Sequence, residues 1–349
     1  MHRSGTSLAT RLVNLLGVDL GNRVFLQGPD NPKGFWEHED IKRVHDRLLH
    51  SLGGRNSHTV LPLPHQWWLG EGIKPFRDEI VYILKRDFSD SPFWGIKDPR
   101  QSRLLPLWKV ILSDMNCKPH FLHVIRNPIE VAASLDKRDG FSVYKSILMW
   151  FQHVTESEAE TRGFPRAFVT FPQVLGDWHS AVCRIASELG IEWPINPDRV
   201  RGDVEQFIDG SLRHHSESDD ALLVRHDVPR YVADLHLDLV KATQKPGHDV
   251  SIVLSRSRAA FEESIRTYFP ILGMASDLTW GSPIETRRQI AHKDAVQTDH
   301  EKRIAELEAE LAAILTSRSW RLTAPLRMVA KRFKGVRKRI LVRASEAAT

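Results

Sequence analysis

The chain has 349 residues, of which 41% are hydrophobic and ten are tryptophan, so it can fill the core of one large α/β domain or two smaller ones and is not a disordered chain. Its two cysteines, Cys117 and Cys183, lie far apart, which argues against a disulfide framework and a cysteine metal site. The net charge of the chain is +5, but ten Lys or Arg and no acidic residue lie in 318–343, so the remaining residues carry a net charge of about −5. The positive charge is therefore local, and a basic surface over the whole molecule is excluded.

The chain has no apolar run of about 18 residues, so we expect no transmembrane helix. Arg3 and a Gly-Thr-Ser turn stand where the apolar core of a signal peptide would be, so we expect none. These two features predict a cytoplasmic protein.

The first segment, residues 2–7, is a polar turn, and leucines at helical spacing follow it up to Gly17. A Ser-, Gly- and Thr-rich turn that opens into a helix predicts an anion site, because unpaired N–H groups and the helix dipole point outward. Gly5 allows close approach of a ligand, and Arg3 supplies a full positive charge. The alternative is an ordinary helix cap at Ser4 or Thr6. The ATPase loop with its Gly-Lys pair is not matched.

Further along the chain, strand-like and helix-like patterns alternate. Helices are predicted at 39–52, 78–87, 129–136 and 173–189, and strands at 93–97, 120–125 and 167–171. This alternation predicts an α/β fold with a parallel sheet and helices on both faces.

Arg126 follows the clearest predicted strand, and Ser134 lies two helical turns beyond it. Ligands of doubly wound sheets gather at the carboxyl ends of strands, so we expect Arg126 to face the same crevice as the opening turn. If each residue is considered alone, the preferred interpretation is an ordinary surface arginine for Arg126 and an ordinary helix serine for Ser134.

Together, these two motifs resemble those of sulfotransferases. R-S-G-T-S at 3–7 resembles their 5′-phosphosulfate loop, in the bacterial and Golgi-like form with Arg in place of Lys, and V-I-R-N-P-I-E-V-A-A-S at 124–134 resembles their 3′-phosphate motif. The resemblance implies a P-loop-like fold and 3′-phosphoadenosine 5′-phosphosulfate as the donor of a sulfuryl group. It assigns Arg126 and Ser134 to the 3′-phosphate. It assigns the following residues to the 5′-phosphosulfate: Arg3, Ser4, Gly5, Thr6 and Ser7.

Sulfuryl transfer needs positive charge on the moving group and a base for the acceptor hydroxyl. Arg3 and Lys97 are the candidates for the charge, and W-G-I-K-D-P-R around Lys97 resembles the K-D-P segment of sulfotransferases that act on carbohydrates and proteins; a surface lysine is the alternative. Related enzymes place a catalytic glutamate after the first helix, which favours Glu37 as general base. The alternatives to Glu37 are His38, Glu39 and Asp40.

No metal is expected, because adjacent histidines such as those of Arg213-His214-His215 diverge on regular structure and no acidic cluster accompanies them. A solvated loop is the preferred interpretation of that segment.

The chain departs from the pattern of the sulfotransferase family at two places. In the family a buried strand precedes the first loop, so either the start lies further upstream or the first central strand is missing, which would leave ladder groups unpaired and a gap in the core. Phe171-Pro172-Gln173 lacks the family's aromatic-acid pair, which predicts a weak helix cap. The alternative function is therefore a non-catalytic, membrane-associated assembly partner with a degenerate sulfotransferase fold.

We divide the chain into a sulfotransferase-like domain at 1–285, a short coiled-coil helix at 286–317 and a basic amphipathic tail at 318–349. Apolar residues at 3-4-3 spacing in 301–315 predict self-association. Cations and Trp320 in 318–343 predict peripheral attachment to the anionic inner face of a membrane, with a solvated helix as the alternative and nucleic-acid binding disfavoured. S-R-S-W-R-L-T-A-P-L-R at 317–327 resembles the tails of bacterial enzymes of surface-polysaccharide assembly, and this resemblance implies a glycan or glycolipid acceptor.

Overall fold

The computed structural model describes residues 1–25, 31, 33–53, 55–60, 63–208, 219–245 and 247–263. The chain divides into two compact units, Met1–Ser264 and Ile265–Thr349, and every described residue lies in the first. The predicted coiled coil, the basic tail, their domain boundaries and the Arg213-His214-His215 sequence lie outside the described residues.

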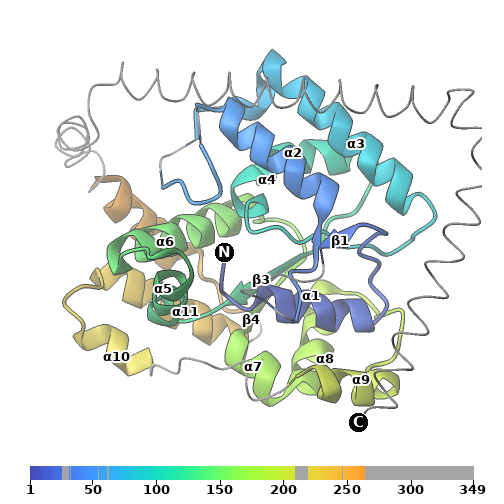
Figure 1. The fold of residues 1–349 in the computed structure, drawn as a ribbon. Helices are drawn as coiled ribbons and strands as arrows, with labels where there is room; N and C mark the ends of the chain where they lie inside the picture. Colours follow the sequence, from blue (N-terminus) through green and yellow to red (C-terminus); the bar gives the residue numbers. More distant parts are fainter. Residues whose placement is uncertain are drawn as a thin grey trace, which may run out of the picture. The chain divides into compact units, whose positions relative to one another are not determined.

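The described part of the chain is mostly helical, and its strands are short (Figure 1). Its helices and strands are α1 (Thr6–Leu15), β1 (Val24–Phe25), β2 (Glu37–His38), α2 (Glu39–Ser51), α3 (Lys74–Phe88), α4 (Gln101–Asp114), β3 (Phe121–Ile125), α5 (Pro128–Asp139), α6 (Val143–Glu160), β4 (Arg166–Thr170), α7 (Phe171–Gly176), α8 (Trp178–Leu189), α9 (Arg201–Phe207), α10 (Asp219–Val224) and α11 (Arg230–Gln244). Three short 3-10 turns lie at Trp67–Leu69, Glu71–Ile73 and Pro197–Val200, and residues 251–263 are helical. None of the described helices combines the length and the apolarity that a membrane span requires.

The central element is the parallel pair β3–β4, in register from Phe121↔Arg166 to Ile125↔Thr170. This pair confirms the predicted α/β class and the parallel pairing of the strands at 120–125 and 167–171. The prediction of a strand at 93–97 is wrong: among the residues that the structure describes, this segment makes a single parallel bridge, between Trp94 and Asp19. The partner segment turns away at Gly21, whose φ is 79°.

Helices cover both faces of the β3–β4 pair, because successive side chains of a strand point to opposite faces. On one face, Ala167 and Val169 pack with residues of α1 and α8. On the other, Ile125 and Phe168 pack with residues of α5, α6 and α11. Figure 1 shows these two groups of helices on either side of the strands.

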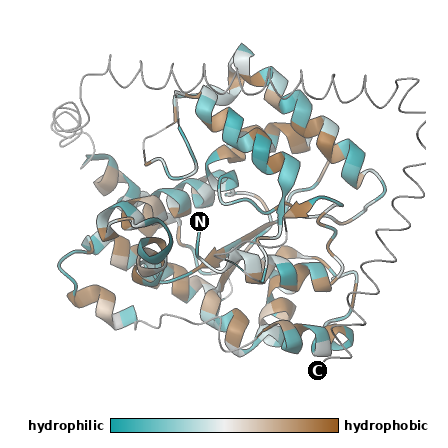
Figure 2. Ribbon diagram, in the orientation of Figure 1, coloured by the Kyte–Doolittle hydropathy of each residue, from teal (hydrophilic) through white to brown (hydrophobic). Residues whose placement is uncertain are grey.

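A further hydrophobic cluster holds α2, α3 and α4 together around the fully buried Trp108. Figure 2 shows how brown, hydrophobic stretches alternate with teal ones along these helices. The cluster fixes α2, whose first residue follows Glu37 and His38 directly, and α4, which begins just after Arg100. It therefore positions two segments that carry charged groups of the candidate site.

The single helix predicted at 173–189 is wrong, because the chain forms α7 and α8 with a break at Asp177. The Asp177 side chain accepts a hydrogen bond from the Ser180 N–H at 3.1 Å and so caps α8. The predicted weak cap before α7 is also wrong. Thr170 and Gln173 form a reciprocal capping box, with hydrogen bonds of 3.2 and 2.9 Å. Gln173 therefore caps the helix in the way expected of an acidic residue.

Candidate functional site

The opening turn places backbone N–H groups at the start of α1 without a side-chain cap among the described residues. Gly5 occupies the cap position with φ of 87°, and a Cβ atom there would lie 2.2 Å from the ring of Phe171. Only glycine combines this left-handed conformation with so close a neighbour. The predicted alternative, a Ser4 or Thr6 cap, is not what caps α1.

The second motif is held at the end of β3 by its own helix cap. The Asn127 side chain accepts a hydrogen bond from the Ile129 N–H at 3.0 Å, and Pro128 starts α5. Arg126 therefore leaves the strand at its carboxyl end, and Ser134 follows two turns later on α5.

Two hydrogen bonds join the opening turn to the second motif. The Arg3 Nε donates to the Ser134 Oγ at 2.9 Å, and an Arg126 amino group donates to the Arg3 carbonyl oxygen at 3.0 Å. Residues more than 120 positions apart in the sequence thus share one location, as the crevice hypothesis requires. We call Arg3, Arg126, Glu130 and Ser134 the Arg126 cluster.

Glu130 is the member of this cluster that the sequence reasoning missed. Its carboxylate lies 2.8 Å from the Arg126 Nε, and both side chains are buried. The Arg126 guanidinium also lies 4.5 Å from the ring centroid of Phe171, so its plane is fixed from two sides. The i,i+4 spacing of Arg126 and Glu130 in the 124–134 motif is the signal that could have identified the pair.

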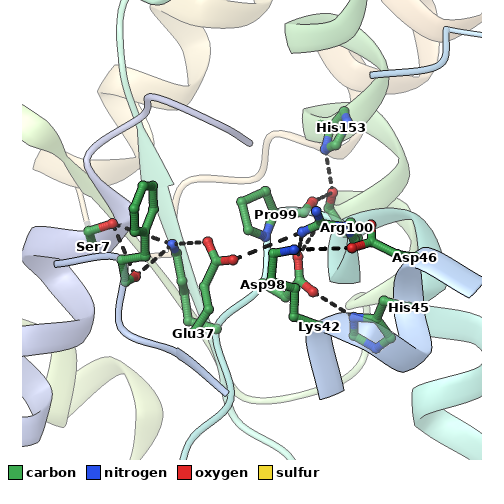
Figure 3. Close-up of polar contacts among 12 residues, drawn as sticks. Ser7, Glu37, Lys42, His45, Asp46, Asp98, Pro99, Arg100 and His153 are labelled. Atoms are coloured by element: carbon green, nitrogen blue, oxygen red, sulfur yellow. Dashed lines mark hydrogen bonds and ion pairs between the residues drawn. The ribbon is translucent and has the colours of Figure 1, made fainter. Parts of the chain in front are cut away.

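Lys97, Glu37 and Ser7 form the other half of the site. The Lys97 Nζ donates to Glu37 Oε1 at 2.7 Å, to the Phe35 carbonyl at 3.0 Å and to the Ser7 Oγ at 3.3 Å. Figure 3 shows Glu37 between Ser7 on one side and Arg100 on the other. Both charged side chains are largely buried, so Lys97 is not the surface lysine of the alternative interpretation.

Arg100 flanks the Glu37 carboxylate opposite Lys97 and was also missed from the sequence. An Arg100 amino group lies 3.9 Å from Glu37 Oε2 and donates to Asp98 Oδ1 at 2.9 Å (Figure 3). Burial opposes the charge of both groups, but Asp98 and Asp46 raise the pKa of Arg100, and Arg100 and His45 hold the pKa of Asp98 well below its usual range. We call Ser7, Glu37, Lys97 and Arg100 the Lys97 cluster.

A hydrogen-bond chain behind Asp98 fixes its orientation. The His45 Nδ1 lies 2.8 Å from Asp98 Oδ2, and the Trp108 indole donates to His45 Nε2 at 2.9 Å. Indole nitrogen is only a donor, so His45 Nε2 accepts and the proton on Nδ1 is donated to Asp98. This chain ties Arg100 to the α2–α4 core.

Three histidines lie beside these clusters. The ring centroid of His2 is 5.1 Å from that of His58 and 6.2 Å from that of His153, and the His153 Nδ1 lies 2.6 Å from the Ser102 Oγ. Burial lowers the pKa of all three histidines, and neighbouring positive charges lower those of His2 and His153 further.

The three alternatives to Glu37 are engaged elsewhere. His38 bonds Asp87 at 2.9 Å and caps α2, while Glu39 and Asp40 pair with arginines on the outer side of α2. Of these four residues, Glu37 is the one whose acid group meets Lys97.

The remaining predicted residues flank the two clusters. Ser4 is buried within the opening turn, and Thr6 is the first residue of α1. Among the described residues, no three His, Cys, Asp or Glu side chains are grouped so that they could hold a metal ion. Comparison of the chain with protein-family models, curated proteins and solved structures finds no match.

Proposed function

We propose that the chain is a sulfotransferase of P-loop-like fold, which moves a sulfuryl group from 3′-phosphoadenosine 5′-phosphosulfate to a hydroxyl of a glycan or glycolipid. The observation that carries this proposal is the pair of hydrogen bonds by which Arg3 meets Ser134 and Arg126. Two motifs that resemble the two phosphate-binding motifs of sulfotransferases are adjacent, as binding both ends of one nucleotide requires.

Each of the two clusters binds one end of the nucleotide. Arg126 and Ser134 bind the 3′-phosphate, and the Arg3 side chain, which reaches Ser134, adds charge at that end. The N–H groups at the start of α1, with Ser7 and Lys97, bind the 5′-phosphosulfate. This division gives Arg3 a binding role and leaves Lys97 as the cation of the transferred group.

The transfer step uses Lys97 and Glu37. The acceptor oxygen forms its bond to sulfur as the bond between sulfur and the bridging phosphate oxygen breaks, and the acceptor proton passes to Glu37. The product nucleotide is 3′-phosphoadenosine 5′-phosphate. Lys97 contacts both Glu37 and Ser7. A sulfuryl oxygen bound beside Ser7 would therefore attract the Lys97 ammonium away from Glu37 and leave the Glu37 carboxylate able to accept the proton.

The acceptor class and the cellular setting rest on the sequence of the tail. We propose that 318–343 attaches the cytoplasmic protein to anionic lipid and that 301–315 supports self-association. Flotation with anionic liposomes tests the attachment: binding that is lost in high salt is expected, and salt-insensitive binding or none contradicts it.

Calorimetry with 3′-phosphoadenosine 5′-phosphate tests the donor site. The informative variant combines Arg126→Met with Glu130→Leu, which removes the phosphate cation together with the buried carboxylate of its ion pair. We expect the wild type to bind and the double variant to bind at least about tenfold more weakly. A wild type that does not bind would exclude the sulfotransferase and favour the non-catalytic assembly partner.

A further inference from the structure

The guanidinium of Arg100 uses only part of its hydrogen-bonding capacity. Its Nε donates to Asp46 Oδ1 at 2.5 Å, and its Nη1 donates to Asp98 Oδ1 at 2.9 Å. A guanidinium has five N–H donors and no acceptor, so one N–H of Nη1 and both of Nη2 remain. Among the residues that the structure describes, these donors have no hydrogen-bond acceptor, although the side chain is buried. Buried donors ordinarily have acceptors, which indicates a ligand.

The remaining Nη1 donor lies beside the proposed general base. The Arg100 Nη1 is 3.9 Å from Glu37 Oε2, which is too far for a hydrogen bond (Figure 3). A single oxygen atom can lie within about 2.9 Å of both atoms, accept from the guanidinium and donate to the carboxylate. A hydroxyl group is both an acceptor and a donor, so it fits this position.

The two oxygens of the Glu37 carboxylate have different surroundings. Oε1 accepts a hydrogen bond from Lys97 at 2.7 Å, whereas Oε2, on the Arg100 side, accepts none within the described part of the chain. Oε2 is therefore the oxygen that can accept a proton without first losing a partner. An acceptor hydroxyl bound between Arg100 and Oε2 would also approach from the side opposite Lys97, the cation assigned to the sulfuryl group.

The orientation of the Arg100 guanidinium is fixed before any ligand binds. Asp98 holds Nη1 and is itself held by His45, which accepts a hydrogen bond from the Trp108 indole. Asp46 holds Nε from the α2 side. Donors that are held in one direction select ligands by geometry, because a ligand with differently placed oxygens cannot reach them all.

We propose that Arg100 is the acceptor-binding residue, whose Nη1 holds the reacting hydroxyl against Glu37 Oε2 and whose Nη2 binds an oxygen on the neighbouring carbon. The inference rests on the proposed function and adds an acceptor class, the vicinal diol of a sugar ring. Two neighbouring amino groups of one arginine match two neighbouring oxygens. In the step, the reacting oxygen bonds to sulfur, its proton passes to Glu37 Oε2, and the bond from sulfur to the bridging phosphate oxygen breaks.

Competition between two small alcohols tests the inference with the full chain. The protein is incubated with 3′-phosphoadenosine 5′-phosphosulfate and equal concentrations of ethylene glycol and ethanol, and 2-hydroxyethyl sulfate, ethyl sulfate and inorganic sulfate are quantified by mass spectrometry. Ethanol lacks the second oxygen, so the ratio of the two alkyl sulfates per hydroxyl reports the contact with Nη2. We expect the wild type to prefer ethylene glycol by about tenfold, as one hydrogen bond to a charged group provides.

Arg100→Lys retains the positive charge but lacks paired amino groups, so the preference should fall to about twofold or less. Arg103→Lys is the matched control, because Arg103 is another buried arginine of the same segment and pairs with Glu156 at 2.9 Å. The control should keep the preference of the wild type.

A second pair of variants keeps the test decisive if Arg100→Lys does not fold. Asp46 is 41% exposed, so its substitution disturbs the core little. Asp46→Ala removes the acceptor that holds the Arg100 Nε and should lower the preference by about threefold, whereas Asp46→Asn keeps an oxygen at this position and should retain it.

Equal yields of the two alkyl sulfates per hydroxyl from the wild type would overturn the inference and leave sulfuryl transfer itself intact. An Arg100→Lys or Asp46→Ala protein that folds and keeps the full preference would also overturn it. If the wild type forms none of the three sulfate products, the proposed function and this inference are both contradicted.

Discussion

The Arg126 cluster and the Lys97 cluster both pair a cation with a buried glutamate, but they are assembled differently. Arg126 and Glu130 are four residues apart on one strand–helix unit, and their ion pair of 2.8 Å is local. Lys97 and Glu37 are 60 residues apart and meet at 2.7 Å only because α2 and α4 pack on a common core. A local pair is determined by spacing, whereas a distant pair depends on the whole fold.

The comparison also separates binding from chemistry. The Arg126 side chain is fixed by Glu130 and Phe171, as suits a rigid phosphate site. Lys97 has three acceptors within 3.3 Å and can exchange one for another, as suits a group that follows a charge during a reaction. The predictions below test this difference.

The largest expected effect is on turnover. Glu37→Gln should lower the rate of sulfuryl transfer by about 10²–10⁴-fold while the affinity for 3′-phosphoadenosine 5′-phosphate is retained, because a general base is lost and the phosphate contacts remain. Transfer kinetics and calorimetry measure the two quantities. Glu39→Gln is the matched control, since Glu39 pairs with Arg43 on the exposed side of α2, and it should change turnover by less than about twofold. Full activity of Glu37→Gln would show that the base lies elsewhere.

The next effect is on stability in the Arg126 cluster. Arg126→Ala should lower the free energy of unfolding by about 3–5 kcal/mol, because the buried Glu130 carboxylate loses its guanidinium. Arg126→Met combined with Glu130→Leu should recover most of that loss. Urea denaturation of the three proteins measures this, and a double variant no more stable than Arg126→Ala would contradict the ion-pair explanation.

Gly5 permits a matched test of the opening turn. Gly5→Ala and Gly140→Ala both place a side chain at positive φ, 87° and 67°, but only the first also puts Cβ 2.2 Å from Phe171. We expect Gly5→Ala to be the more destabilising by about 1–3 kcal/mol, the usual cost of overpacking. Thermal or urea unfolding measures both variants. Equal losses of unfolding free energy would show that the Phe171 ring moves aside without a cost in stability.

The smallest effect is a pH dependence from the buried histidines. Because burial lowers the pKa of His153 below 6.5, the unfolded chain binds more protons than the folded one below that pH, so stability falls as the pH decreases from 6.5. Each such histidine contributes at most about 1.4 kcal/mol per pH unit. His153→Gln, which retains a hydrogen-bonding group near Ser102, should reduce the slope of unfolding free energy between pH 6.5 and 5. An unchanged slope would contradict the role of His153.

By itself, the sequence determined the local features. The periodicity of residues 120–136 predicted β3, the Arg126 turn and the start of α5, because a strand, a proline and a helix cap act over a few residues. The break at Asp177 was missed, since a side-chain cap can interrupt a pattern that is amphipathic on both sides of it.

Tertiary structure decided the rest. The approach of Arg100 to Glu37 and the edge-on contact of the His2 ring with the His153 ring join segments whose separation in sequence carries no signal. Such contacts depend on how three hydrophobic clusters pack against one another, and that packing is a property of the folded chain as a whole, whereas capping and periodicity are properties of neighbouring residues.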